Sequence, residues 1–136
     1  MAERRRFLIV SLEGENYGLP VSGLLEITVA RNIQKDSNLE ELYEGTFEFR
    51  GTLIPVLNIK KLFRLASRPL TTLLVVKSDK RILGILVDAV IDIVDTEEQP
   101  IPMPDGVLNP ELRYYNGILR YREKLVLLLN ADGMLP

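Results

Sequence analysis

Acidic side chains gather in one short stretch of the chain, at Asp92, Asp95, Glu97 and Glu98. Carboxylates at this density could bind a cation, but their spacing does not match a calcium loop, which needs a central Gly and a closing Glu. The sequence also contains no His and no Cys, so it lacks the usual general base near neutral pH and the imidazole and thiolate metal ligands. We therefore predict no catalytic, metal-binding or cofactor-binding residues, and we interpret the acidic stretch as a solvated strand edge.

A second stretch, from Arg113 to Arg122, mixes arginine with Tyr114, Tyr115 and Tyr121. Cations interleaved with aromatic rings can stack nucleic-acid bases on a small β-barrel. The formal net charge is −2, from 17 basic and 19 acidic residues, so the chain as a whole does not attract nucleic acid. A nucleic-acid-binding small-barrel protein stays an alternative, but protein partners are favoured.

The elements that carry these residues are arranged as a repeat. Residues 7–28 align without a gap over residues 73–94, and Phe49-Arg50 aligns over Tyr121-Arg122 at an offset six residues larger. Any two strand-rich stretches align passably, because Val, Ile and Leu recur in strands. The match also includes two Gly pairs outside that pattern, so we favour a duplication with one insertion in the second copy.

Each copy is predicted to contain five short strands, which suggests barrels rather than one open sheet. In the first copy Ser37 could cap a short helix, with Glu40 completing a capping box. The equivalent connection in the second copy contains three prolines within residues 100–104, so we expect an extended strap there. The expected strands are 7–12, 17–20, 24–29, 47–49 and 52–59, followed by 72–76, 82–87, 90–94, 119–121 and 124–130.

Two stretches of the sequence carry a resemblance to a known family. They are the hairpin Phe49-Arg50-Gly51-Thr52-Leu53-Ile54-Pro55-Val56-Leu57-Asn58-Ile59 and the later run Leu83-Gly84-Ile85-Leu86-Val87-Asp88. The chain resembles the CheW-like adaptors of bacterial chemotaxis signalling from about Arg6 to Leu135. The resemblance implies an all-β fold of two SH3-like five-stranded barrels within a single domain, 1–136. The subdomains are expected near 1–68 and 69–136, and an exchange of terminal strands between them is left open.

The resemblance also implies a non-catalytic scaffold that couples the cytoplasmic tip of a methyl-accepting chemoreceptor to the regulatory domain of a CheA-like histidine kinase. Such an adaptor needs no cofactor and binds no nucleic acid. The longest apolar run, residues 125–129, has the length of a strand, so we expect no membrane insertion. The expected location is the cytoplasm, in association with receptor arrays.

The family pattern implies an ion pair between Glu26 and Arg50, which either braces the barrel or shapes a partner-binding edge. The sequence departs from the usual family pattern at Glu48 and Asn58, and their effect on binding is left open. The implied kinase contacts are Glu26, Val29, Ile33, Tyr43, Phe47 and Arg50. The implied receptor contacts, in a groove between the barrels, are Val21, Leu24, Val87 and Val90.

Overall fold

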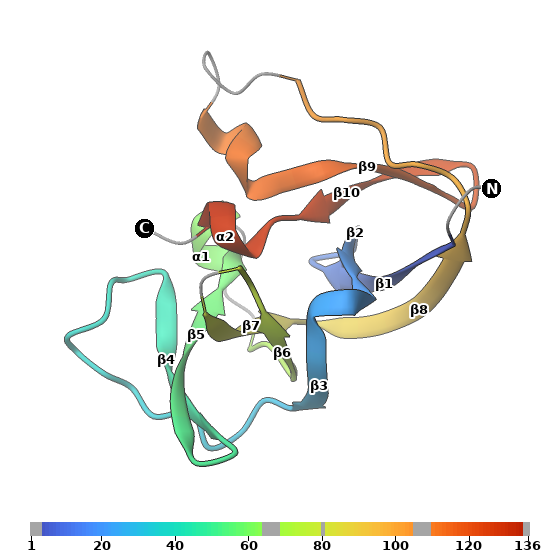
Figure 1. The fold of residues 1–136 in the computed structure, drawn as a ribbon. Helices are drawn as coiled ribbons and strands as arrows, with labels where there is room; N and C mark the ends of the chain where they lie inside the picture. Colours follow the sequence, from blue (N-terminus) through green and yellow to red (C-terminus); the bar gives the residue numbers. More distant parts are fainter. Residues whose placement is uncertain (1–3, 64–68, 80, 105–109, 135–136) are drawn as a thin grey trace. The chain divides into compact units, whose positions relative to one another are not determined.

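The structure, a computed structural model, describes residues 4–63, 69–79, 81–104 and 110–134. Its strands form two five-stranded sheets, one in the order β8-β1-β2-β10-β9 and one in the order β3-β6-β7-β5-β4 (Figure 1). The helices of the described residues contain three to five residues each, and none is long and apolar enough to cross a membrane. The prediction of an all-β fold with two five-stranded, SH3-like subdomains is therefore confirmed.

Unit 1 contains the described residues up to Ser22 and those from Ile91 onward. β1 and β2 form an antiparallel hairpin, as do β9 and β10, and β10 runs parallel to β2. Phe7 and Ile9 alternate along β1 and share a core with Leu119 and Leu128. The elements are β1 (Arg5–Leu12), β2 (Glu15–Pro20), η1 (Val21–Gly23), β8 (Ala89–Thr96), η2 (Pro110–Tyr114), β9 (Tyr115–Tyr121), β10 (Lys124–Leu129) and α2 (Ala131–Met134).

Unit 2 is the continuous segment Gly23–Val90. Leu73 and Val75 of the interior strand β6 are fully buried in its core together with Val56. Burial of each such side chain stabilises the fold by about 1.5–3 kcal/mol. The elements are β3 (Leu24–Val29), β4 (Tyr43–Phe49), β5 (Thr52–Asn58), α1 (Ile59–Phe63), β6 (Thr72–Lys77) and β7 (Ile82–Val87).

Each sheet takes strands from both sequence repeats. β1 and β2 of the first repeat join β8, β9 and β10 of the second, while β6 and β7 of the second repeat join β3, β4 and β5 of the first. The chain crosses from unit 1 to unit 2 within η1 and returns within β8. The compact units therefore have bounds other than the sequence halves 1–68 and 69–136.

A backbone crossing occurs at the same repeat position in both units. The connection before β4 passes so close to Gly45 that a Cβ there would collide with the carbonyl oxygen of Gln34. At Gly117 in β9 a Cβ would lie 3.0 Å from the carbonyl oxygen of Ile101. Ile101 also exchanges two backbone hydrogen bonds of 2.8 Å with Ile118, which confirms the extended strap that the prolines predicted.

All ten predicted strands are present, and the largest differences lie at the starts of β4 and β9. These strands begin at Tyr43 and Tyr115, whereas the sequence predicted starts at residues 47 and 119. Gly45 and Gly117 interrupt the runs of β-branched and aromatic residues that indicate a strand. The sequence analysis therefore missed the first four residues of each strand.

The predicted helix near Ser37 is wrong. Residues 36–42 form turns, in which the Asp36 carboxylate accepts a 3.0 Å hydrogen bond from the Asn38 N–H. Asp36 therefore closes an Asx turn instead of capping a helix. A helix has no room to continue here, because the extended strand β4 already begins at Tyr43. The capping-box spacing of Ser37 and Glu40 thus gave a false signal.

Candidate partner-binding surfaces

β3 forms one edge of the sheet of unit 2 and exposes a row of apolar side chains. Leu25, Ile27 and Val29 alternate along one face of this strand and are 36%, 44% and 52% exposed. Exposed apolar side chains on an edge strand invite pairing and mark interaction sites. The sequence predicted Val29 as a partner contact but missed Leu25 and Ile27, although their spacing of two residues was a usable signal.

Glu26 and Arg50 do not form the predicted ion pair, so that prediction is wrong. Among the described residues Glu26 has no ion-pair partner, and the Arg50 guanidinium lies 4.7 Å from the centre of the Phe49 ring. The register of β3 is irregular between Leu24 and Glu26. Both charged side chains are exposed, so screening by solvent leaves little energy for a pair that must also order two long side chains.

The equivalent residues of unit 1 do form such a pair. Asp92 in β8 accepts a 2.9 Å hydrogen bond from the Tyr121 hydroxyl and a 2.8 Å bond from the Ile93 N–H, and it lies 3.5 Å from Arg122 Nη2. The Tyr121 hydrogen bond, followed by that of Ile93 and the charge of Arg122, lowers the pKa of Asp92. Burial and the bond to Asp92 raise the pKa of Tyr121. This cluster links the two edge strands of unit 1.

Three further residues predicted to face the kinase are mostly inside unit 2. The Tyr43 ring is buried, and its hydroxyl accepts a 3.3 Å hydrogen bond from Arg81 Nη2. Ile33 and Phe47 pack against the core cluster and are half-buried. These side chains shape the surface of unit 2, while Val29, Glu26 and Arg50 are the accessible members of the predicted set.

The residues predicted to line a receptor groove fall in both units. Val21 begins η1 in unit 1 and is half-buried, whereas Leu24, Val87 and Val90 belong to unit 2. Leu24 and Val90 are half-buried, but Val87 at the end of β7 has no exposed surface. Leu24 and Val90 are thus the predicted receptor residues of unit 2 that keep accessible apolar atoms.

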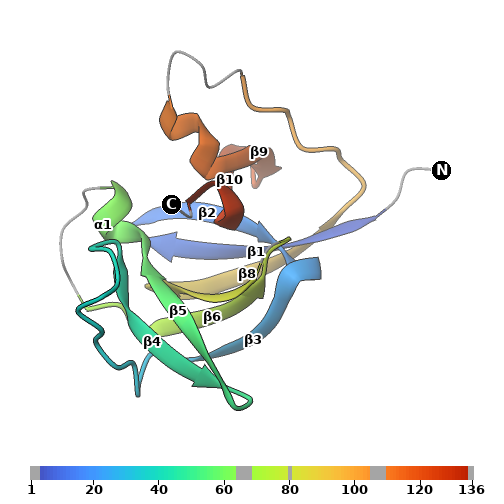
Figure 2. The same ribbon diagram turned by 60° about the vertical axis from the view of Figure 1, so that its left-hand side comes forward.

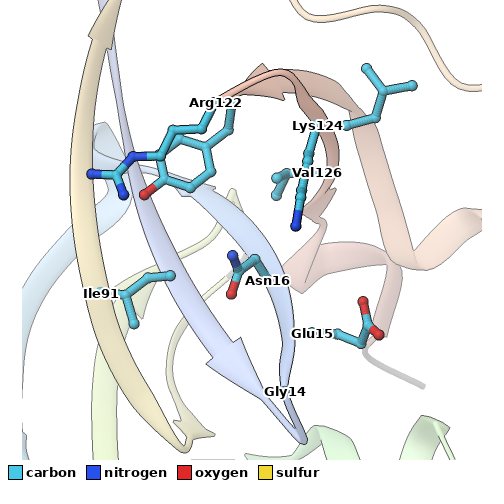
Figure 3. A pocket seen from close by; sticks show the side chains of 9 residues that line it. Gly14, Glu15, Asn16, Ile91, Arg122, Lys124 and Val126 are labelled. Atoms are coloured by element: carbon cyan, nitrogen blue, oxygen red, sulfur yellow. The ribbon is translucent and has the colours of Figure 1, made fainter.

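Unit 1 has a depression of about 370 Å³ at the ends of its two hairpins. Figure 3 shows Asn16 of β2 in its centre, with Ile91 on one side and the β9–β10 turn with Arg122 above. Ile91 and Leu125, which line it, are 46% and 64% exposed. The sequence analysis did not select them, although their repeat counterparts in unit 2 are exposed as well.

The arginines of the Arg113–Arg122 stretch are largely engaged within unit 1. Arg113 donates a 3.2 Å hydrogen bond to the Gly133 carbonyl oxygen and stacks on Tyr114. Arg122 lies over the Tyr121 ring and beside Asp92. Contacts within unit 1 thus engage Arg113 and Arg122, which does not favour the nucleic-acid alternative.

Two residues of the acidic stretch of unit 1 form ion pairs with arginines of the same unit. Asp95 and Glu97 lie 3.1 and 3.2 Å from the guanidinium of Arg4. Over the part of the chain that the structure describes, no group of three or more Asp, Glu, His or Cys residues could hold a metal ion.

Unit 2 contains two further ion pairs. The buried Lys60 ammonium lies 3.0 Å from Asp88 Oδ1. Glu44 accepts a hydrogen bond of 3.2 Å from the Asn58 amide and lies 3.3 Å from Lys61 Nζ. The Asn58 bond, followed by the Lys61 contact, lowers the pKa of Glu44. Asn58, one of the two departures from the family pattern, therefore has an internal role.

The chain contains two five-stranded β units, each with exposed apolar side chains and arginines on its surface. These features define a small-barrel protein-interaction module. A family model for the CheW-like domain matches residues 6–136, and the chain belongs to this family.

Known proteins of the same kind support this assignment. The chain is 25% identical over 135 residues to "Chemotaxis protein CheW" of Klebsiella aerogenes, covering 96% of this chain and 81% of that protein. It is 28% identical over 96 residues to "Chemotaxis protein CheW" of Rhizobium meliloti, covering 68% of this chain and 62% of that protein. The crystal structure of the scaffolding protein TtCheW from Thermoanaerobacter tengcongensis matches with a TM-score of 0.83 and 26% identity, covering 94% and 90% of the two chains.

Proposed function

We propose that the chain is a non-catalytic adaptor that couples chemoreceptors to a CheA-like histidine kinase in bacterial chemotaxis-type signal transduction. Membership of the CheW-like family over residues 6–136 supports this role, as does the likeness to proteins named for chemotaxis and scaffolding. The observation that carries the proposal is the exposed apolar row on β3 of unit 2.

The kinase contact is assigned to unit 2. Leu25, Ile27 and Val29 supply apolar area, and Glu26 and Arg50 on the same unit are exposed and not used in an internal ion pair. A barrel of the same class in the kinase regulatory domain could pair with the edge strand and offer opposite charges to both residues. Arg50 suits this role because its planar donor fork binds a carboxylate in a bidentate manner.

The receptor contact is assigned to Val21 in unit 1 and to Leu24 and Val90 in unit 2, while Val87 is buried. These half-buried side chains can receive the apolar face of an amphipathic helical hairpin. A few anchors of this kind dominate the binding energy. Val90→Asp should therefore weaken binding to a purified receptor tip, measured by calorimetry, and leave kinase binding unchanged.

The proposed role includes no chemical reaction catalysed by the chain. Coupling requires only that the chain binds the receptor and the kinase at the same time. An adaptor of this kind acts in the cytoplasm as part of receptor arrays. A fluorescently tagged chain should gather at receptor clusters and disperse in cells that lack receptors.

Kinase stimulation tests the assignment to unit 2. Purified chain is added to receptor-containing membranes and a CheA-like kinase, and kinase autophosphorylation is measured. Ile27→Asp should weaken kinase binding by about tenfold and abolish most stimulation, because a charge enters the centre of the apolar row. The matched control is Ile93→Asp at the repeat position in unit 1, where Ile93 is 58% exposed.

Equal loss with both variants would show that the kinase surface is not specific to unit 2. Absence of stimulation by the wild-type chain, with both partners shown to be active, would overturn the adaptor proposal itself.

A further inference from the structure

A second depression of unit 1 opens at the start of β1 and has a volume of about 590 Å³. Phe7, Pro20, Val21, Pro100 and Leu128 form its apolar wall. Phe7 and Leu128 also belong to the core cluster, so the depression is an open end of the core of unit 1. Its volume lies within the range of about 300–1,000 Å³ that is usual for binding sites.

Three consecutive arginines also line this depression, and two of them are already paired. Arg4 binds Asp95 at 3.1 Å and Glu97 at 3.2 Å, and Arg6 Nε lies 3.8 Å from Asp95 Oδ2. Figure 2 shows why these pairs form, because the start of β1 runs beside the end of β8. Arg5 has no ion pair with any residue that the structure describes.

The alternation of β1 explains this difference among the arginines. Phe7 and Ile9 of β1 belong to the core cluster, and Arg5 continues their row of alternate positions at its open end. Arg4 and Arg6 also line the depression, but their guanidinium groups are paired with Asp95 of β8 and, for Arg4, with Glu97 just beyond it. One unpaired guanidinium thus stands beside an apolar wall, and Asn116 adds a polar amide to the same depression.

We infer that this depression binds an acidic side chain of a partner protein, with a neighbouring apolar residue of that partner packed against the half-buried Pro20 and Val21. An arginine beside an apolar wall selects a carboxylate through a bidentate, charge-assisted contact. The inference rests on the proposed function, because Val21, a proposed receptor contact, lines the same depression. The partner is therefore the chemoreceptor tip, which must place Asp or Glu beside an apolar residue.

The test compares Arg5→Glu with Arg120→Glu in the full-length chain. Arg120 is an exposed arginine of β9 in the same unit, outside the depression, and it has no ion pair among the described residues. Calorimetry with a purified receptor cytoplasmic fragment should show affinity weakened about tenfold or more by Arg5→Glu and unchanged by Arg120→Glu. Arg5→Lys should give a smaller loss, because lysine keeps the charge without the fork. Unchanged kinase binding by the variants would show that they are folded.

The possible failures are distinguishable. If Arg5→Glu and Arg120→Glu bind the receptor fragment as the wild-type chain does, while Val90→Asp does not, the inference is wrong and the receptor role stands. If the wild-type chain does not bind the fragment at all, the receptor role and the inference fall together. If Arg5-dependent binding is seen instead to phosphatidylcholine vesicles with about a quarter phosphatidylserine, without receptor, the site serves a membrane surface and the inference is overturned.

Discussion

Equivalent positions at the hairpin ends of the two units make different contacts. In unit 1 Asp92 binds the Tyr121 hydroxyl and lies beside Arg122, so the acid is satisfied within the unit. In unit 2 the counterpart of Tyr121 is Phe49, which has no hydroxyl, and Arg50 stacks on its ring. One hydroxyl group, present on Tyr121 and absent from Phe49, thus distinguishes an internal link between the edge strands of unit 1 from two charged side chains of unit 2 that are available to a partner.

The backbone crossings should give the largest difference between the units. Gly45→Ala should destabilise the chain by about 3 kcal/mol, because its Cβ would meet the rigid carbonyl of Gln34. Gly117→Ala should cost about 1 kcal/mol, because its Cβ would lie 3.0 Å from the Ile101 oxygen. Urea unfolding of both variants measures this, and equal losses would contradict the closer approach in unit 2.

Removal of the Tyr121 hydroxyl should disturb unit 1 and leave unit 2 unaffected. Tyr121→Phe removes the strongest donor to Asp92, so the pKa of this acid should rise toward its ordinary value. In the wild-type chain the lowered pKa of Asp92 stabilises the fold above about pH 4, and this contribution is lost as the pH falls through the folded pKa. The stability difference between wild type and Tyr121→Phe should therefore be present at pH 6 and shrink below pH 4, as measured by urea titrations. A difference independent of pH would exclude Asp92 as the partner that matters.

The reciprocal substitution Phe49→Tyr should make unit 2 resemble unit 1. The new hydroxyl occupies the repeat position of the Tyr121 hydroxyl, so we expect it to donate a hydrogen bond to the Glu26 carboxylate. Kinase binding should weaken modestly, because Glu26 would then be engaged internally. NMR detection of a slowly exchanging hydroxyl proton on the new Tyr measures the first effect, and its absence would show that the irregular register of β3 keeps the groups apart.

The turns of the two hairpins should give the smallest effect. Glu123 has a φ of 63° at the position where unit 2 has Gly51 with a φ of 83°. A left-handed conformation costs a non-glycine residue about 1 kcal/mol, part of which is offset by the greater unfolded-state freedom of glycine. Glu123→Gly should therefore stabilise the chain by about 0.5 kcal/mol in thermal unfolding. Gly51→Ala should do the opposite, and stabilisation by both would contradict the turn assignment.

Much of the fold could be predicted because its signals are local. Strands such as β3 and β7 have the predicted bounds, since runs composed mostly of Val, Ile and Leu mark them. The repeat also predicted Gly45 and Gly117 as equivalent. The helix at Ser37 was mispredicted because a capping box describes one turn, whereas the entry into β4 is set by pairing with β5.

The site was harder to predict because it depends on distances between strands. The family pattern placed Glu26 near Arg50, but sequence could not show that a ring would hold the guanidinium. It also could not show that Tyr43 and Val87 are buried or that Ile27 is exposed. Arg5 was likewise not selected, because its difference from Arg4 and Arg6 exists only through the ion pairs to β8.

The exchange of strands between repeats also determines the order in which the chain can fold during synthesis. Unit 2 is continuous from Gly23 to Val90, so it can form as soon as β7 has left the ribosome. β1 and β2 are made first, yet their sheet partners in β8, β9 and β10 are made last. Until then the apolar strand β1 is an unpaired edge that can attach to other nascent chains. A pause in translation after Val90 would therefore prolong a state prone to aggregation in unit 1 while unit 2 is already complete.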